Sequence, residues 1–149
     1  MPYDPSAPTA QERTGSYIVI WIAAIASLGM LALRLLDISG HPWGLACMLF
    51  GLPMLAILYD RRHDDYFRSL RDFGLRIAMM VIAAWVAVQG LLFIAGAARS
   101  AGYAAAEGPG AQAPRFVLPP LFDDAGLLAS LAAFGFSAGF VFAYARSSR

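Results

Sequence analysis

Charge, lysine and cysteine are scarce in this 149-residue chain. Charged residues make up 14% of it and hydrophobic residues 59%, whereas soluble domains carry about 25% and about 45–50%. There is no lysine and the net charge is +1, so no basic surface can hold nucleic acid. The single cysteine, Cys47, excludes an intrachain disulfide and a cysteine zinc cage. This composition excludes an ordinary soluble enzyme and a disordered chain, because only a bilayer can cover so much apolar surface.

Groups that perform chemistry are also sparse. The chain has two histidines, and His41 and His63 are expected on opposite sides of a membrane. They therefore cannot share a metal ion or hold a haem between them. No serine–histidine or cysteine–histidine pair is expected at one depth, as nucleophilic catalysis requires. The sequence thus predicts no catalytic residue, no metal site and no cofactor.

What the chain has in quantity is long apolar sequence. Four runs lack Asp, Glu, Lys and Arg, and they cover 14–33, 38–59, 77–98 and 125–145. A bilayer core about 30 Å thick needs about 20 helical residues, and an open sheet cannot cross it because its edges would stay unpaired. We therefore predict an all-α integral membrane protein whose four transmembrane helices pack as a small bundle within a domain over 17–149. The predicted spans are 17–36, 42–59, 76–98 and 125–145.

The first 16 residues differ from the rest of the chain. Residues 1–16 contain three prolines and few apolar residues, which predicts a disordered N-terminal tail. The run that follows could instead be the core of a cleaved signal peptide. Its apolar stretch reaches Leu36, however, and a signal-peptide core is only about 7–15 residues long. We therefore favour an uncleaved first helix.

The arginines indicate the orientation in the membrane, because cytoplasmic segments carry an excess of positive charge. The predicted inner side holds Arg13, Arg61, Arg62, Arg68, Arg71, Arg76, Arg146 and Arg149. The opposite side holds only Arg34, Arg99 and Arg115. Both termini are therefore expected in the cytoplasm. Arginine in place of every lysine is typical of a GC-rich bacterial genome, so we expect a bacterial inner-membrane protein.

The segment before the third span combines charge with an apolar stripe. Opposite charges recur at four-residue steps, which favours a helix, along Asp60, Asp64, Arg68, Asp72 and Arg76. The opposite face carries Tyr66, Phe67, Leu70, Phe73 and Ile77. We predict an amphipathic cytoplasmic helix over about 60–75, with a bend at Gly74, that lies on lipid headgroups or docks a partner. The residues expected to contact that lipid or partner are Arg34, Arg61, Arg62, Arg68 and Arg71.

The opposite side of the membrane holds a long connection, 99–124, rich in Ala, Gly and Pro. It exceeds the usual length of structureless connections, about 12–15 residues. Asp123 and Asp124 are expected to cap the last span. Arg34 is expected to snorkel and pair with Asp37, or else to bind a lipid phosphate or a partner's carboxylate. No charge is expected near the middle of any span.

Small and polar residues within the spans predict packing. Gly135, Gly139 and Ala143 are spaced by four, which forms a ridge that another helix can approach closely. The ridge serves packing within this bundle or against another protein. Gln89 lies in an apolar stretch, where its amide needs a hydrogen-bond partner. That partner is either another helix or the water of a pore.

These features favour a non-catalytic protein over an enzyme. We expect a small accessory, scaffolding or assembly subunit of a larger membrane complex. Its expected partners are membrane lipids and either another membrane protein or a second copy, and not nucleic acid. The alternative is a small oligomeric channel or transporter with a pore near Gln89. A weaker alternative is a membrane enzyme or lipid-binding protein that uses Arg34 or the helix over 60–76.

Overall fold

The computed structural model describes residues 10–38, 40–59, 65–108, 119 and 121–147. Within these residues the chain forms only helices, which are α1 (Ala10–Leu35), α2 (His41–Tyr59), α3 (Asp65–Glu107) and α4 (Ala125–Ser147). Each is long and apolar enough to cross a membrane. The prediction of an all-helical fold with four such helices is confirmed, and these helices suggest a multi-pass membrane protein.

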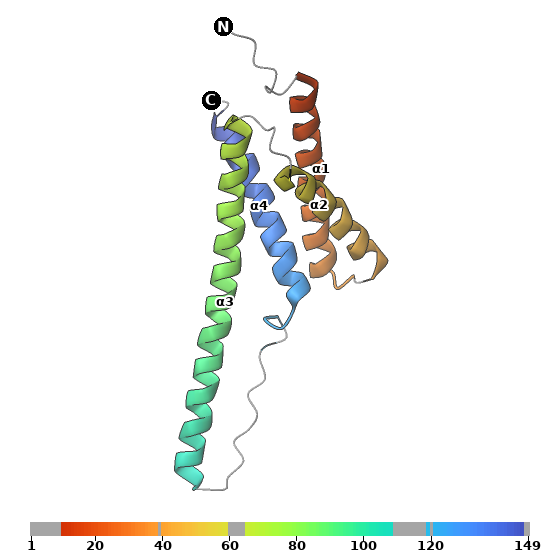
Figure 1. The fold of residues 1–149 in the computed structure, drawn as a ribbon. Helices are drawn as coiled ribbons and strands as arrows, with labels where there is room; N and C mark the ends of the chain where they lie inside the picture. The colour runs from red at the N-terminus through yellow and green to blue at the C-terminus, as the bar shows by residue number, and fades with distance from the viewer. Residues whose placement is uncertain (1–9, 39, 60–64, 109–118, 120, 148–149) are drawn as a thin grey trace.

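Helix α4 holds the arrangement together, because both α1 and α3 pack against it while α2 packs on α1 (Figure 1). Tyr17 of α1 contacts Tyr144 near the end of α4, and Arg34 near the end of α1 meets Asp124 just before α4. Helices α1 and α4 are therefore antiparallel. We call the end that holds Tyr17 and Tyr144 the inner end, after the predicted orientation, and the opposite end the outer end.

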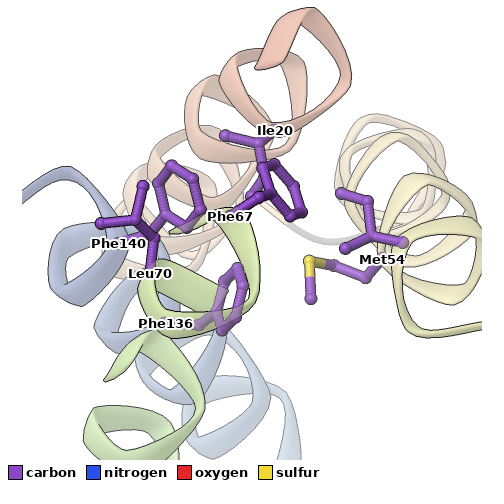
Figure 2. Close-up of a cluster of buried hydrophobic side chains, with 7 residues drawn as sticks. Ile20, Met54, Phe67, Leu70, Phe136 and Phe140 are labelled. Atoms are coloured by element: carbon purple, nitrogen blue, oxygen red, sulfur yellow. The ribbon is translucent and has the colours of Figure 1, made fainter. Parts of the chain in front are cut away.

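The main core lies toward the inner end and draws on all four helices (Figure 2). Its buried members are Ile20, Met54, Ile57, Phe67, Leu70, Phe136 and Phe140. The rings of Phe67 and Phe140 pack edge to face with centroids 5.6 Å apart, a geometry that aromatic pairs prefer. Phe67 and Leu70 are each only 2% exposed. The stripe predicted to lie on headgroups is thus partly core.

Helix α1 starts earlier than predicted and ends in a defined cap. Residues 10–16 are helical, rather than part of a disordered tail, because alanine, glutamine, glutamate and arginine among them favour helix. Residues 1–9 lie outside the described part. At the other end, Ile38 N–H donates to Leu33 O at 2.8 Å and Asp37 N–H to Arg34 O at 3.1 Å. Asp37 has a φ of 56°, so it occupies the left-handed position that ends many helices.

Helix α3 replaces three predicted elements. It runs unbroken from Asp65 to Glu107 over 43 residues, whereas a cytoplasmic helix, a span ending at 98 and a loop starting at 99 were predicted. The sequence after Ala98 is rich in alanine, which continues a helix, and Arg99 does not interrupt it. Gly108, with a φ of +88°, ends the helix in the manner of a glycine cap. The outer connection is correspondingly shorter than predicted.

The contact between α3 and α4 fixes their relative height. A Cβ atom built on Gly139 would lie 3.1 Å from the Cα of Gly74 and 2.9 Å from Ile77 Cγ1. The charged first turns of α3 therefore lie beside the apolar second half of α4. Arg76, next to Ile77 in sequence, is level with the middle of α4, contrary to the expectation that charges avoid that level. Beyond Gln89, α3 extends past the start of α4 (Figure 1).

Candidate functional site

The predicted small-residue ridge of α4 lies against α3. A Cβ on Gly135 would be 3.2 Å from Val81 Cγ2, and one on Gly139 would clash with Ile77. Ala143 borders the main core. The sequence did not identify Gly74 as the other half of this contact: a Cβ there would lie 2.8 Å from the carbonyl oxygen of Phe136. Gly74 therefore permits close approach, and α3 continues through it as a helix where a bend was predicted.

Arg34 is paired with a residue far away in the sequence. Its Nε donates to Oδ2 of Asp124 at 2.7 Å, so the predicted pair with Asp37 is wrong. This hydrogen bond from Arg34 holds the pKa of the Asp124 carboxyl below its ordinary value, because it stabilises the charged form. The pair joins the outer ends of α1 and α4.

Asp124 also caps α4, as predicted. Its Oδ1 accepts a hydrogen bond from the backbone N–H of Leu127 at 3.0 Å, which satisfies one of the free amides of the first turn. Gly126 leaves room beside this site, since a Cβ there would lie 3.3 Å from both Arg34 Nε and Trp43 Cζ2. The indole Nε1 of Trp43 is buried, with no hydrogen-bond partner among the described residues.

Gln89 binds the segment that leads into α4. Its Nε2 donates to the carbonyl oxygen of Phe122 at 2.5 Å, and the ring of Phe122 lies against Trp85 with centroids 5.2 Å apart. Trp85 is only 9% exposed, so it is a packing residue, and its aromatic partner lies in the segment before α4. Together Trp85 and Gln89 fasten this connection to α3.

A buried hydroxyl pair joins α1 to α4 near the middle of the bundle. Ser27 Oγ donates to Ser137 Oγ at 2.9 Å, and Ser137 Oγ also donates to Ala133 O at 3.1 Å. Ser27 is fully buried and Ser137 is 5% exposed. The two hydroxyls satisfy each other between helices, which is how polar groups act in membrane bundles.

Two inner arginines form local ion pairs within the described part of α3, whereas Asp60 and Asp64 of the predicted four-residue row lie outside the described residues. Arg68 lies 3.3 Å from Asp65, and Arg71 lies 3.0 Å from Asp72. Asp72 therefore pairs with its neighbour rather than one turn away. Arg61 and Arg62 fall outside the described residues. The arginines that can be placed line the first turns of α3, beside the inner end of the bundle.

The side of α3 that faces away from α4 is uncovered. On this side Met79, Met80 and Val86 are 62%, 67% and 57% exposed, whereas Trp85, on the side toward α4, is only 9% exposed. Leu91, Phe93 and Ile94, each 67% exposed, belong to the part of α3 that extends past the start of α4. Arg76 points away from Gly74 by helical geometry and is exposed. Within the described part of the chain, Arg76 has no ion-pair partner.

Neither metal-ligand clusters nor known relatives assign a function. Across the described residues, no group of three or more His, Cys, Asp or Glu side chains could hold a metal ion. No family model, curated protein or solved structure matches the chain. The function must therefore be argued from the surfaces above.

Proposed function

We propose that this chain is a small multi-pass protein of a bacterial inner membrane that serves as a non-catalytic accessory or assembly subunit of a larger membrane complex. Both termini lie in the cytoplasm, because most arginines flank that side. The observation that carries the proposal is the uncovered side of α3. It belongs to the most apolar of the four candidate spans, and the one described helix that packs extensively on α3, α4, lies on the opposite side.

Arg76 strengthens the case for a protein partner on this side. It is level with the middle of α4, where it would face hydrocarbon if nothing covered it. A charged side chain at that depth is costly and normally pairs with an opposite charge. A carboxylate from a neighbouring transmembrane helix would offset that cost, and lipid tails would not. The partner is therefore a membrane protein that presents an acidic group to α3.

Gln89, which carries the channel hypothesis, is engaged in a different role. Its amide nitrogen is bound to Phe122, so it fastens a connection instead of pointing a free donor into a water path. A single amide also provides too few polar groups to line a water-filled pore about 30 Å long. These considerations favour the subunit over the channel.

The proposal is tested by purification from the native membrane in a mild detergent, followed by mass spectrometry. We expect a membrane protein to co-purify in fixed proportion with the wild-type chain and to be lost with Arg76→Gln. Arg99→Gln is the matched control, because Arg99 is an exposed arginine on the same helix near its outer end. Equal recovery with both variants, or a wild-type chain that purifies alone, would contradict the proposal.

A further inference from the structure

The outer part of α3 stands clear of the bundle. Gln89 is level with Phe122, just before α4 begins, so residues 90–107 project past the start of α4 (Figure 1). At 1.5 Å per residue this projection is about 27 Å long. Leu91, Phe93 and Ile94 near its base are each 67% exposed. Helices in proteins owe most of their stability to the packing of an apolar face, and the projection has no such packing within the described bundle.

One side of α3 carries a close-packing pattern along its whole exposed length. From Arg76 onward, exposed positions at alternating steps of four and three residues form one stripe, which is the spacing by which two helices pack as a coiled coil. We call this stripe, from 76 to 104, the α3 seam. It lies opposite the contact between α3 and α4. Its small residues are Ala83, Ala87, Gly90, Ala97, Ala101 and Ala104.

The two sides of the projection differ in character. Arg99 and Tyr103 are four residues apart and lie on the side that contacts α4 in the earlier turns. That side therefore becomes polar where α4 no longer covers it. The seam carries only alanine in the same turns, at Ala97, Ala101 and Ala104. The projection is thus amphipathic, with its apolar face on the seam, as in a helix that packs on one side.

The height of the seam decides what can cover it. In the proposed orientation the ion pair of Arg34 and Asp124 lies at the outer surface of the bilayer, so Ala101 and Ala104 lie outside it and lipid tails cannot cover them. A second copy packed seam to seam in the same orientation would bring Arg76 against its own counterpart, and like charges repel strongly at low dielectric. Small side chains favour a different helix instead, because they let two backbones approach closely.

We propose that the seam binds one long helix of the partner protein, which presents a carboxylate to Arg76 and continues beside α3 as far as Ala104. This inference rests on the proposed function and adds the shape of the partner. Ala104 is about 22 Å beyond Gln89 along the helix axis, so the partner's transmembrane helix projects from the outer surface by a similar distance. The charge pair at Arg76 sets the register of the two helices, and the alanines bring them close together.

The test is photo-crosslinking in native membranes, with a photoreactive residue at Ala87, Ala101 or Ala104 of the seam. Tyr103 and Ala106 are the control positions, because they lie on the other side of the same turns. We expect an adduct with the same protein from all three seam positions and none from the controls. An adduct from Ala87 alone would overturn this inference and leave the proposed function standing. No adduct at any position would contradict both, and equal adducts at Ala101 and Tyr103 would overturn the seam.

A pair of charged variants gives a second readout. Ala101→Glu places a carboxylate in the seam, and Ala106→Glu places the same group on the opposite side of the projection. Both residues lie beyond α4, so both variants should unfold in detergent at the wild-type midpoint. We expect recovery of the partner to fall by about tenfold or more with Ala101→Glu, because an unpaired charge is costly to bury, and to stay at the wild-type level with Ala106→Glu. Equal recovery with the two variants would overturn the proposal.

Discussion

The Nε of Arg34 lies 2.7 Å from Oδ2 of Asp124, and this pair fastens the end of α1 to the start of α4. The second oxygen of the same carboxylate, Oδ1, caps α4 through the amide of Leu127. Asp124 therefore has two structural tasks: its Oδ2 forms the ion pair with Arg34, and its Oδ1 caps α4. Substitutions can separate these tasks, because asparagine also caps helices but carries no charge.

Replacement of Asp124 should give a graded loss of stability. Asp124→Asn keeps the cap and loses the ion pair, whereas Asp124→Ala loses both. The cap itself is expected to contribute about 0.5–2 kcal/mol, so Asp124→Ala should be the least stable of the three proteins. Thermal unfolding in detergent measures the order. An alanine variant as stable as wild type would show that neither contact matters.

The same pair predicts a pH dependence. The pKa of Asp124 is lowered in the folded protein by the hydrogen bond from Arg34. A carboxyl with a lowered folded pKa stabilises the fold fully above its ordinary pKa and loses that effect as pH falls through the folded pKa. The stability advantage of wild type over Asp124→Asn should therefore be present near neutral pH and shrink in strong acid. An advantage that stays constant with pH would contradict the ion pair.

Bulk at the crossing of α3 and α4 should destabilise the protein. Gly139→Leu places side-chain atoms where a Cβ alone would lie 2.9 Å from Ile77, and overpacking costs about 1–3 kcal/mol. Gly90→Leu is the control, because a Cβ there would meet nothing within 4 Å. Unfolding in detergent should show a lower midpoint for Gly139→Leu only. Equal midpoints would place Gly139 on a free surface.

Gln89→Leu should have a small effect on stability. It removes the bond to Phe122, and such bonds contribute about 0.6 kcal/mol on average in membrane proteins. The variant also removes the cost of desolvating an amide. In liposomes, we expect wild type and variant alike to conduct no ion or small solute above empty vesicles. Flux through wild type that Gln89→Leu abolishes would support the channel instead.

Apolar run length was sufficient to predict the main elements of the fold. The four helices correspond to the four runs without charge, since run length alone decides whether a helix can cross a bilayer. Helix ends were less predictable. The predicted span ended before Arg99, because a charge marks the edge of the bilayer. Helix propensity does not depend on membrane depth, so the alanine-rich sequence after Arg99 continues α3 as far as Gly108. The start of α1 at Ala10 has the same explanation.

Contacts between distant residues were the least predictable part. Ser27 and Ser137 were expected to lie in spans, and nothing in the sequence paired them. Arg34 was matched to Asp37 because sequence proximity is the only guide before the helices are packed. The glycine at position 74 predicted a bend in the helix. In the structure Gly74 instead allows α3 to approach α4 closely, and this role depends on Gly139 of the other helix. These contacts depend on how the helices pack and on the register between them, which the sequence of a single helix does not reveal.

The central claim is that the uncovered side of α3 contacts another membrane protein. Photo-crosslinking in native membranes tests it, with a photoreactive residue placed at Ala83 or Ala87, both exposed on that side of α3. The control position is Leu55 of α2, which is 65% exposed. We expect one discrete protein adduct from both α3 positions and none from Leu55. Adducts that are absent, or alike at all three positions, would contradict the claim, and an adduct of two copies of this chain would replace the accessory role with self-association.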